Sequence, residues 1–171
     1  MTARSDINLG RGAAYTISSS GQYSNINLGR NAVLTVDTDA TIYVTNMFHF
    51  DRDSQLRITN DVDVKIYVDT TLTLDQGSRM NNLSEDPTKF GVYGTASFTN
   101  TVDIDQGSNF YGTIHTPNGS IQIDQNTIIY GALLASSINL DRRATIHFDE
   151  ALLNAGGSSG SGYSVAYWQE K

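Results

Sequence analysis

Seven short stretches of the chain alternate apolar, polar and apolar residues, and a turn-forming sequence comes directly after each one. The stretches are Ile7-Asn8-Leu9, Ile26-Asn27-Leu28, Phe48-His49-Phe50, Leu72-Thr73-Leu74, Val102-Asp103-Ile104, Ile121-Gln122-Ile123 and Ile138-Asn139-Leu140. A period of two in so short a run indicates a strand with one buried face, because successive side chains point to opposite sides of a strand. We therefore expect each stretch to bury its first and third residues and to expose the middle one.

The turn after these stretches is itself repeated. LDQGS at 74–78 returns as IDQGS at 104–108, and looser copies begin at the other five stretches. The first residues of the copies are Leu9, Leu28, Phe50, Leu74, Ile104, Ile123 and Leu140, at intervals of 19, 22, 24, 30, 19 and 17 residues. A period near 20 with variable insertions is typical of a solenoid, in which each repeat is one coil stacked on the last.

Each coil contains three strands. A second strand comes after the turn, as in Leu34-Thr35-Val36, and a third comes after a further small turn, as in Ile42-Tyr43-Val44. The sequence thus predicts an all-β chain: a single right-handed parallel β-helix of about six to seven triangular coils, each of 17–30 residues. An antiparallel sandwich would also alternate, but it has no reason to repeat its turn chemistry in phase with one strand. The handedness is expected from the general preference of parallel crossovers.

The domain boundaries are set by the end of the repeat. We expect the solenoid to occupy residues 1–154, with one short helical turn within 149–156. AGGSSGSG at 155–162 reads as a flexible linker, and YSVAYWQEK at 163–171 as a terminal strand that folds back and caps the solenoid. Residues 81–90 lengthen one coil and contain the Ser-Glu-Asp-Pro cluster of a loop.

Composition excludes several classes of protein. The net charge of −7 and the pI near 4.7 argue against nucleic acid as a partner, because phosphate binding relies on clustered Lys and Arg. No apolar run approaches the roughly 18 residues of a membrane span. The absence of cysteine removes disulfides, thiol catalysis and Cys-ligated zinc.

The second position of the turn places a row of carboxylates along one edge. The row consists of Asp51, Asp75, Asp105, Asp124 and Asp141. Asp in a turn ordinarily accepts hydrogen bonds from its own backbone, which is the interpretation that we favour. A calcium ladder is the alternative, although neither the EF-hand spacing nor the GGxGxD repeat of calcium solenoids occurs. Arg52, Arg142 and the neighbouring Gln column would offset part of the repulsion.

Aromatic residues form two outward columns, which are the candidate binding residues. Tyr43, Tyr67 and Tyr93 are continued by His115 on one strand family, and Tyr111 and Tyr130 are continued by His147 on another. Such residues are often simply good cross-strand neighbours. The functional alternative is a contact stripe whose rings, about 5 Å apart, offer a flat, partly apolar surface to sugars or to a protein. Loop 81–90 would then form one wall of the site.

Catalysis is not expected. The only histidines, His49, His115 and His147, fall on strand faces, and no nucleophile elbow, phosphate loop or HExxH motif occurs. A carboxylate pair on adjacent coils keeps a polysaccharide-active enzyme as a distant alternative. We assign no catalytic residue, no metal ligand and no cofactor.

The stretch from Ala32 to Leu152 resembles a family of bacterial β-solenoid domains at the C-terminal end of PilX-like, type IV pilus-associated proteins. The resemblance is carried by TIYV at 41–44, KIYVDTTLTLDQGS at 65–78, FGVYGT at 90–95, NFYGTIHTPNGSIQI at 109–123, IIYGALLASSINL at 128–140 and IHFDEAL at 146–152. The closing YSVAYWQEK is similar to the family's terminal strand. The segment GTIHTPNGSIQI also resembles bactofilins, which are cytoskeletal β-helices that polymerise end to end.

The resemblance implies a pilus or bacterial cell-surface location, with an anchor outside this chain and no defined chemistry. We therefore expect a noncatalytic structural or adhesion domain that binds pilus or surface proteins, or glycans. A self-assembling, bactofilin-like β-helix is the second expectation.

Overall fold

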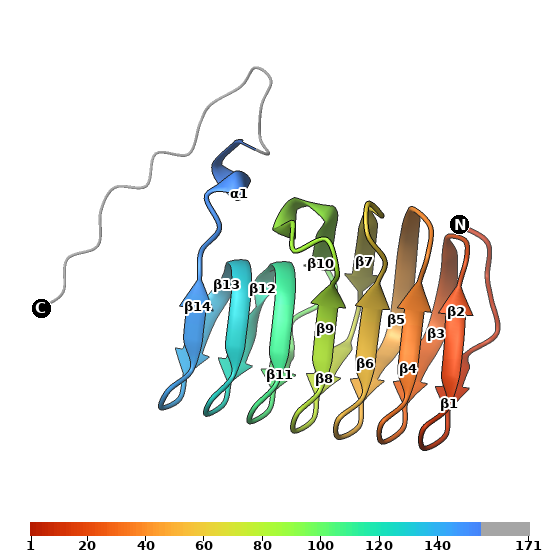
Figure 1. Cartoon of the computed structure of the whole chain (residues 1–171), viewed down its shortest axis with the longest axis horizontal. Helices are drawn as coiled ribbons and strands as arrows, with labels where there is room; N and C mark the ends of the chain where they lie inside the picture. The colour runs from red at the N-terminus through yellow and green to blue at the C-terminus, as the bar shows by residue number, and fades with distance from the viewer. Residues whose placement is uncertain (155–171) are drawn as a thin grey trace, which may run out of the picture.

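A computed structural model of the chain describes residues 1–154. Its strands form one parallel β-solenoid, whose coils stack from the first residues to the last strand along the long axis of the molecule (Figure 1). All the strand pairings in this part of the chain are parallel, as the phase of the repeated turns predicts. The all-β solenoid prediction is therefore confirmed.

Side A of the solenoid contains the strands that lead into the repeated turns. They are β1 (Ile7–Leu9), the end of β3 (Gly21–Leu28), the end of β5 (Ala40–Phe50), β8 (Thr71–Leu74), β11 (Thr101–Ile104) and the ends of β12 (Asn109–Ile123) and β13 (Ile128–Leu140). The register brings the middle residues of all seven stretches into one column, with Asn8 paired to Asn27 and Asp103 paired to Thr73 and Gln122. Successive strands of side A therefore align residue by residue as the repeated turns predict.

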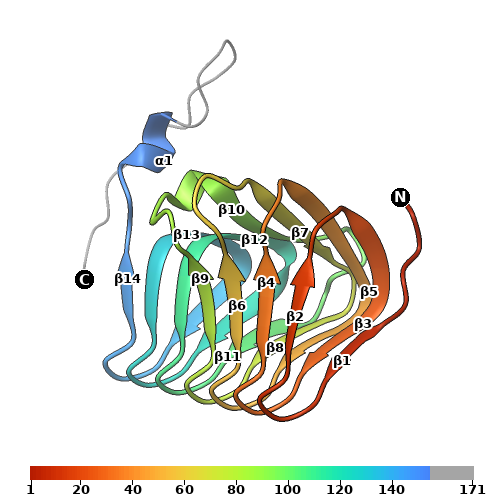
Figure 2. The same cartoon turned by 45° about the vertical axis from the view of Figure 1, so that its right-hand side comes forward.

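Side B comes after the turns, and side C completes each coil (Figure 2). Side B consists of β2 (Ala14–Ile17), β4 (Val33–Val36), β6 (Gln55–Ile58), β9 (Arg79–Asn82), the starts of β12 and β13, and β14 (Thr145–His147). Side C consists of the starts of β3 and β5, then β7 (Val64–Val68), β10 (Phe90–Gly94) and the middle parts of β12 and β13.

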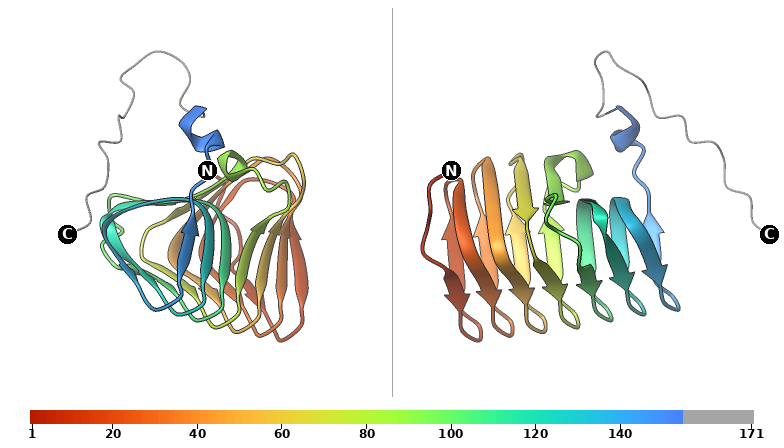
Figure 3. Two further views of the ribbon diagram at one scale, coloured as in Figure 1. Left: turned by 60° about the vertical axis from the view of Figure 1, so that its left-hand side comes forward. Right: turned by 180° about the vertical axis from the view of Figure 1, so that it is seen from behind.

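The core is a single continuous cluster enclosed by the three sides (Figure 3). Inward positions stack as columns of like residues: Ile26, Phe48 and Leu72 succeed one another on side A, and all three are buried. On side B, Phe110 pairs with Ile129 and Ile129 with Ile146, as expected. Phe110 and Ile129 are fully buried, but Ile146 is 39 % exposed. The sequence, in which each of these residues opens the strand after a repeated turn, predicts one buried column of all three; this prediction is wrong at Ile146, because no further coil covers it within the described residues.

The repeated turn has one backbone design. Its fifth residue donates its N–H to the carbonyl of the second, for example Ser78 to Asp75 at 3.0 Å and Ser108 to Asp105 at 3.2 Å. Its fourth residue has a positive φ in every copy: Gly12, Asn31, Asp53, Gly77, Gly107, Asn126 and Arg143, with φ between 58° and 75°. This left-handed conformation favours Gly and Asn. The position that looks variable in the sequence is therefore constrained.

In three copies of the turn, a buried hydroxyl at the fifth position ties the turn to the one before it. Ser78 Oγ donates to the carbonyl of Asp51 at 3.1 Å, Ser108 Oγ to that of Asp75 at 3.2 Å, and Thr127 Oγ1 to that of Asp105 at 3.1 Å. Ser54 has a hydroxyl at the same position, but its buried Oγ has no hydrogen-bond partner in the described part of the chain. The other three copies have Ala there.

Two helical segments leave the coil. The 3-10 helix η1 (Pro87–Lys89) lies in the long insertion, and the four-residue α1 (Ala151–Asn154) comes after β14, in agreement with the helical turn expected near 149–156. Within residues 1–154, no helix is long and apolar enough to cross a membrane. The predicted linker at 155–162 and terminal strand at 163–171 lie outside the described residues.

Candidate functional site

The first aromatic column lies on side C, as the sequence predicts. Tyr43 pairs with Tyr67, Tyr67 with Tyr93, and Tyr93 with His115 in the strand register. We call these four residues the side C row. Their ring centroids are 6.3, 5.2 and 6.2 Å apart in that order. The tyrosines are half-buried, His115 is exposed, and the next residue of the column, Leu134, is 48 % exposed.

The orientation of the rings differs from the flat surface that the sequence suggests. Non-bonded carbons stay about 3.5–4.0 Å apart, so two coplanar rings lying side by side cannot have centroids as close as those of Tyr67 and Tyr93, 5.2 Å apart. These rings, 25° from parallel, overlap face to face instead. The Tyr93 ring lies over Gly91, where a Cβ would meet its hydroxyl at 2.6 Å. In this pair the ring faces cover one another, so Tyr67 and Tyr93 do not form one flat surface.

A carboxylate adjoins the side C row. Asp69 comes directly after β7, and its Oδ1 accepts hydrogen bonds from Tyr43 Oη at 2.7 Å and from Thr95 Oγ1 at 2.5 Å. The first of these bonds raises the pKa of Tyr43, because the Asp69 carboxylate favours the protonated phenol. Asp69 Oδ2 accepts no hydrogen bond from the described residues. The row therefore combines phenol donors with one available carboxylate oxygen and the His115 imidazole.

The second aromatic column lies on side B and is more tightly stacked. Tyr111 and Tyr130 have ring centroids 4.3 Å apart with an interplanar angle of 14°, and Tyr130 and His147 have centroids 4.8 Å apart with an angle of 15°. Burial raises the pKa of Tyr111, and the neighbouring Tyr130 and Glu85 add to the effect. We call these three stacked residues the side B row. The two rows lie on different sides of the coil and form two separate surfaces.

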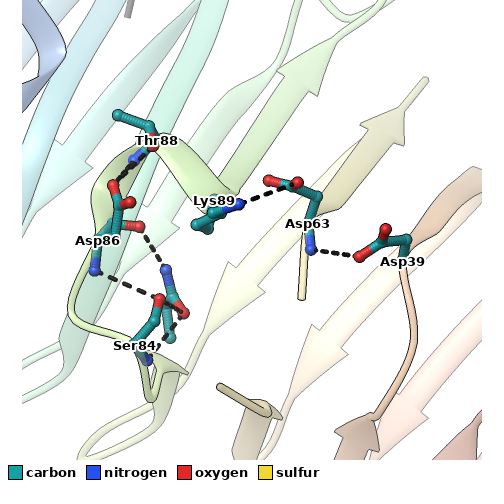
Figure 4. Close-up of polar contacts among 7 residues, drawn as sticks. Asp39, Asp63, Ser84, Asp86, Thr88 and Lys89 are labelled. Carbon is teal, nitrogen blue, oxygen red and sulfur yellow. Dashed lines mark hydrogen bonds and ion pairs between the residues drawn. The ribbon is translucent and has the colours of Figure 1, made fainter. Parts of the chain in front are cut away.

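The loop between β9 and β10 is built by its own polar side chains (Figure 4). The buried Asn82 amide donates to the Asp86 carbonyl at 2.6 Å, and its Oδ1 accepts from Ser84 Oγ at 2.7 Å. Asp86 Oδ1 accepts from Thr88 Oγ1 at 2.6 Å and, as the cap of η1, from Thr88 N at 2.9 Å, and these two bonds lower the pKa of Asp86. Lys89 Nζ reaches Asp63 Oδ2 at 3.3 Å, which ties the loop to the preceding coil. The helix η1 contacts β10, β12, β13 and α1.

The carboxylate row stacks along the turn edge, but the turn-capping interpretation holds only in part. Asp51 and Asp141 accept from the next backbone N–H at 2.6 Å. Asp105 has no such bond, and burial raises its pKa, as do the charges of Asp103, Asp75 and Asp124. Burial likewise raises the pKa of Asp103. His49 Nδ1 lies 3.9 Å from Asp75 Oδ1, and among the described residues neither Arg52 nor Arg142 forms a salt bridge with the row.

No group of three or more His, Asp or Glu side chains within residues 1–154 is arranged to hold a metal ion. A depression of about 470 Å³ is open and runs along the turn edge past Arg30, Arg52 and Gln106. It does not coincide with either aromatic row.

Comparison with known proteins places the chain in a family. The model of a family described as a domain of unknown function (DUF7305) matches residues 3–155. The chain belongs to this family. No curated protein and no solved structure matches it. The match covers the whole solenoid of this DUF7305 domain, from its first bridged residue, Ala3, through α1.

The structure of the DUF7305 domain adds residues to the site that the sequence did not single out. Asp69 and Thr95 lie just beyond their strands at a corner of the coil, and Leu134 continues the side C row after His115. Leu134 could have been found by extending the column by one period. No repeat in the sequence points to Asp69, because its contact with Tyr43 depends on the rotamer of that tyrosine, which lies in the preceding coil.

Proposed function

We propose that this DUF7305 domain is a noncatalytic, cell-surface or pilus-associated display domain that binds an uncharged glycan along the side C row. The observation that carries the proposal is the side C row on one sheet, with Asp69 hydrogen-bonded to its first member, Tyr43. Phenol hydroxyls, a carboxylate oxygen and an imidazole are the groups that exchange hydrogen bonds with sugar hydroxyls. The fixed strands beneath them keep the entropic cost of binding small.

The chemistry of the row favours a glycan without charge. The chain has a net charge of −7, and Asp69 lies within the site, so an anionic polymer would be repelled. A repeating ligand suits a repeating surface, because equivalent groups recur from coil to coil at ring separations of 5.2–6.3 Å. The exposed Leu134 extends the band with an apolar contact at the end nearest the last coil.

The proposed location rests on the resemblance of residues 32–152 to the C-terminal domains of PilX-like, pilus-associated proteins. In that setting an anchor outside this chain would hold the solenoid at the cell surface or on a pilus, and its sides would remain accessible to glycans and to other surface proteins. Nothing in the proposal requires a cofactor or a catalytic residue.

The test is a glycan array and then calorimetric titration of the best ligand. Tyr67→Phe with Tyr93→Phe keeps the stacked rings and removes two hydroxyls. At about 0.5–1.5 kcal/mol for each hydrogen bond, affinity should fall by roughly 5- to 150-fold. The matched control is Tyr111→Phe with Tyr130→Phe on side B, which should bind like the native chain. Equal affinity of the native chain and the side C variant would refute the proposal.

Phenylalanine is a cleaner substitution than serine at these positions. Tyr67 stacks on both Tyr43 and Tyr93, and such aromatic pairs contribute about 0.5–1.5 kcal/mol each. Tyr67→Ser should therefore weaken binding and also lower the free energy of unfolding. The sequence alone suggests an effect on binding with little change in stability, and the stacking geometry corrects that expectation.

End-to-end self-assembly, as in bactofilins, is the second candidate function. It is favoured by the apolar side chains exposed at the last coil, Leu140, Ile146 and Phe148. Light scattering over a range of concentrations separates the two functions, because a filament-forming solenoid gives scattering that rises steeply with concentration and the display domain does not.

A further inference from the structure

The repeated turns carry opposite charges in two parts of the turn edge. The first two copies contain Arg11 and Arg30 but no acidic residue, because Gly stands at their second position. The fourth, fifth and sixth copies contain Asp75, Asp105 and Asp124 but no basic residue. We call the first two turns the basic half of the edge and the fourth to sixth turns the acidic half.

The backbone keeps these charges in line and at a constant spacing. Gly12 N donates to the Arg30 carbonyl at 2.9 Å, Gly77 N donates to the Gln106 carbonyl at 3.1 Å, and equivalent bonds join the other turns of the two halves. Corresponding residues of successive turns are therefore about 4.8 Å apart along the axis. In Figure 1 these turns form a row of loops along the lower edge of the molecule.

Neither half is neutralised by the described residues. Arg11 and Arg30 are exposed and form no salt bridge with them. His49 Nδ1 lies 3.9 Å from Asp75 Oδ1, but within residues 1–154 no Lys or Arg forms a salt bridge with the acidic half. Burial raises the pKa of Asp105, and the charges of three neighbouring aspartates add to the effect. Both halves thus keep charge that a partner can neutralise.

The order of the charges selects the partner. A polyanion that lies along the edge is attracted by the basic half but repelled by the acidic half, which continues the same line, and the reverse holds for a polycation. A partner that matches both halves must present the same charges in the opposite order and at the same spacing. The turn edge of a second copy, turned end for end, meets both requirements.

We propose that two copies of the chain pair along their turn edges in antiparallel orientation, about a two-fold axis between the third and fourth turns. This register places Arg11 opposite Asp124 of the other copy and Arg30 opposite its Asp105. The symmetry produces each of these contacts twice. A parallel arrangement is disfavoured, because it brings like charges together.

The remaining turns limit the strength of the pair. The third turn holds Arg52 between Asp51 and Asp53 and faces the fourth turn of the other copy, so the middle of the register adds no net attraction. The seventh turn lies beyond the overlap. Exposed ion pairs across a narrow row of turns contribute little each and are screened by salt, so the pair is weak and reversible.

Pairing at this edge leaves the side C row free. Sides A and B meet at the turn edge, so side C lies opposite it in the triangular coil. A pair presents two side C rows, and engagement of both by one repeating ligand raises the apparent affinity. The inference does not depend on the glycan proposal, and its test requires no ligand.

Sedimentation of the full chain at low and high salt tests the pairing. In about 20 mM salt the mean mass should rise with concentration from 18.6 kDa and level off at twice that value, because a two-fold contact is closed. In about 1 M salt the Debye length is only about 3 Å, so the association constant should fall at least about tenfold.

Exchange of charges identifies the two halves. Arg11→Glu with Arg30→Glu makes both halves acidic, and Asp105→Arg with Asp124→Arg gives the fifth and sixth turns the charge of the first two. Neither variant should pair with itself, because like charges then face one another. An equimolar mixture of the two variants should associate again, since every opposed contact in the mixed pair is attractive.

The matched control is Arg57→Glu with Lys65→Glu, which changes the net charge by the same amount at exposed positions away from the turn edge. It should associate much more strongly than the Arg11 and Arg30 variant. If the variant of Asp105 and Asp124 unfolds, Gln106→Arg with Gln125→Arg neutralises the same two turns without altering their carboxylates, and it should lower the association constant to the high-salt value.

Three results overturn the proposal: a chain that stays monomeric at low salt, a mass that grows beyond that of the pair, and a mixture of folded variants that does not associate. A monomeric chain that binds polyglutamate, and loses this binding in Arg11→Glu with Arg30→Glu, would assign the basic half to an anionic partner instead.

Discussion

Truncation of Ile129 to Ala tests whether the inward columns hold the solenoid together. Ile129 is fully buried on side B, and its partner Phe110 is fully buried as well. The substitution removes three carbons, which at about 0.8 kcal/mol each corresponds to about 2.4 kcal/mol of lost transfer free energy. The cavity that remains adds to this loss, so we expect the free energy of unfolding to fall by about 2.5–4 kcal/mol.

The matched control is Leu134→Ala on the same strand. Leu134 faces outward and is 48 % exposed, so the same bookkeeping gives at most about 1.2 kcal/mol and no cavity. Urea denaturation monitored by circular dichroism measures both losses, provided that the dependence on urea is unchanged between variants. A loss below about 1 kcal/mol for Ile129→Ala, or equal losses for the two variants, would refute the assignment of inward and outward positions.

Three further predictions concern the turn edge. Ser54→Ala should be neutral or stabilising, because it removes a buried hydroxyl without a partner, whereas Ser108→Ala should cost about 1 kcal/mol; the reverse order in denaturation experiments would contradict the hydroxyl ladder. The raised pKa of Asp105 means that the folded state binds its proton more readily than the unfolded state, so stability falls as pH rises through the window above 3.8. Asp105→Asn should therefore raise the melting temperature at pH 7, but not below pH 3.8, where the Asp105 carboxyl is protonated in both states. The exposed Asp37→Asn is the control, and an unchanged melting temperature of Asp105→Asn at pH 7 would count against the charge repulsion. Chelators should leave the melting temperature unchanged, and a rise of many degrees on adding calcium would favour the metal ladder instead.

The fold could be predicted from the sequence because two independent patterns agree in phase. Alternation identifies the strands of side A, and the repeated turn fixes which residues of successive coils are equivalent, so Asn27 and His49 could be paired without coordinates. The same register predicts that Tyr43, Tyr67 and Tyr93 form a column. Alternation with a period of two leaves little freedom in the pairing register of the strands, since a shift of one residue would turn the whole core face toward solvent.

Side-chain orientation could not be predicted in the same way. Whether a tyrosine column offers faces or edges depends on rotamers, and these depend on local neighbours such as Gly91 beneath Tyr93 and Asp69 beside Tyr43. The positive φ at the fourth turn position was also hidden, because Asp53 and Arg143 occupy it alongside Gly and Asn. The exposure of Ile146 depends on whether another rung covers it, and the equivalence of successive rungs carries no information about the end of the stack.

The most direct test of the proposed function is to map the bound glycan onto the tyrosines. The ring resonances of selectively labelled tyrosine can be assigned by Tyr→Phe substitution and monitored by nuclear magnetic resonance during titration with the best array ligand. The proposal predicts shifts that saturate together at Tyr67 and Tyr93, with Tyr111 and Tyr130 unchanged. Shifts at Tyr111 and Tyr130 with none at Tyr67 and Tyr93 would contradict it.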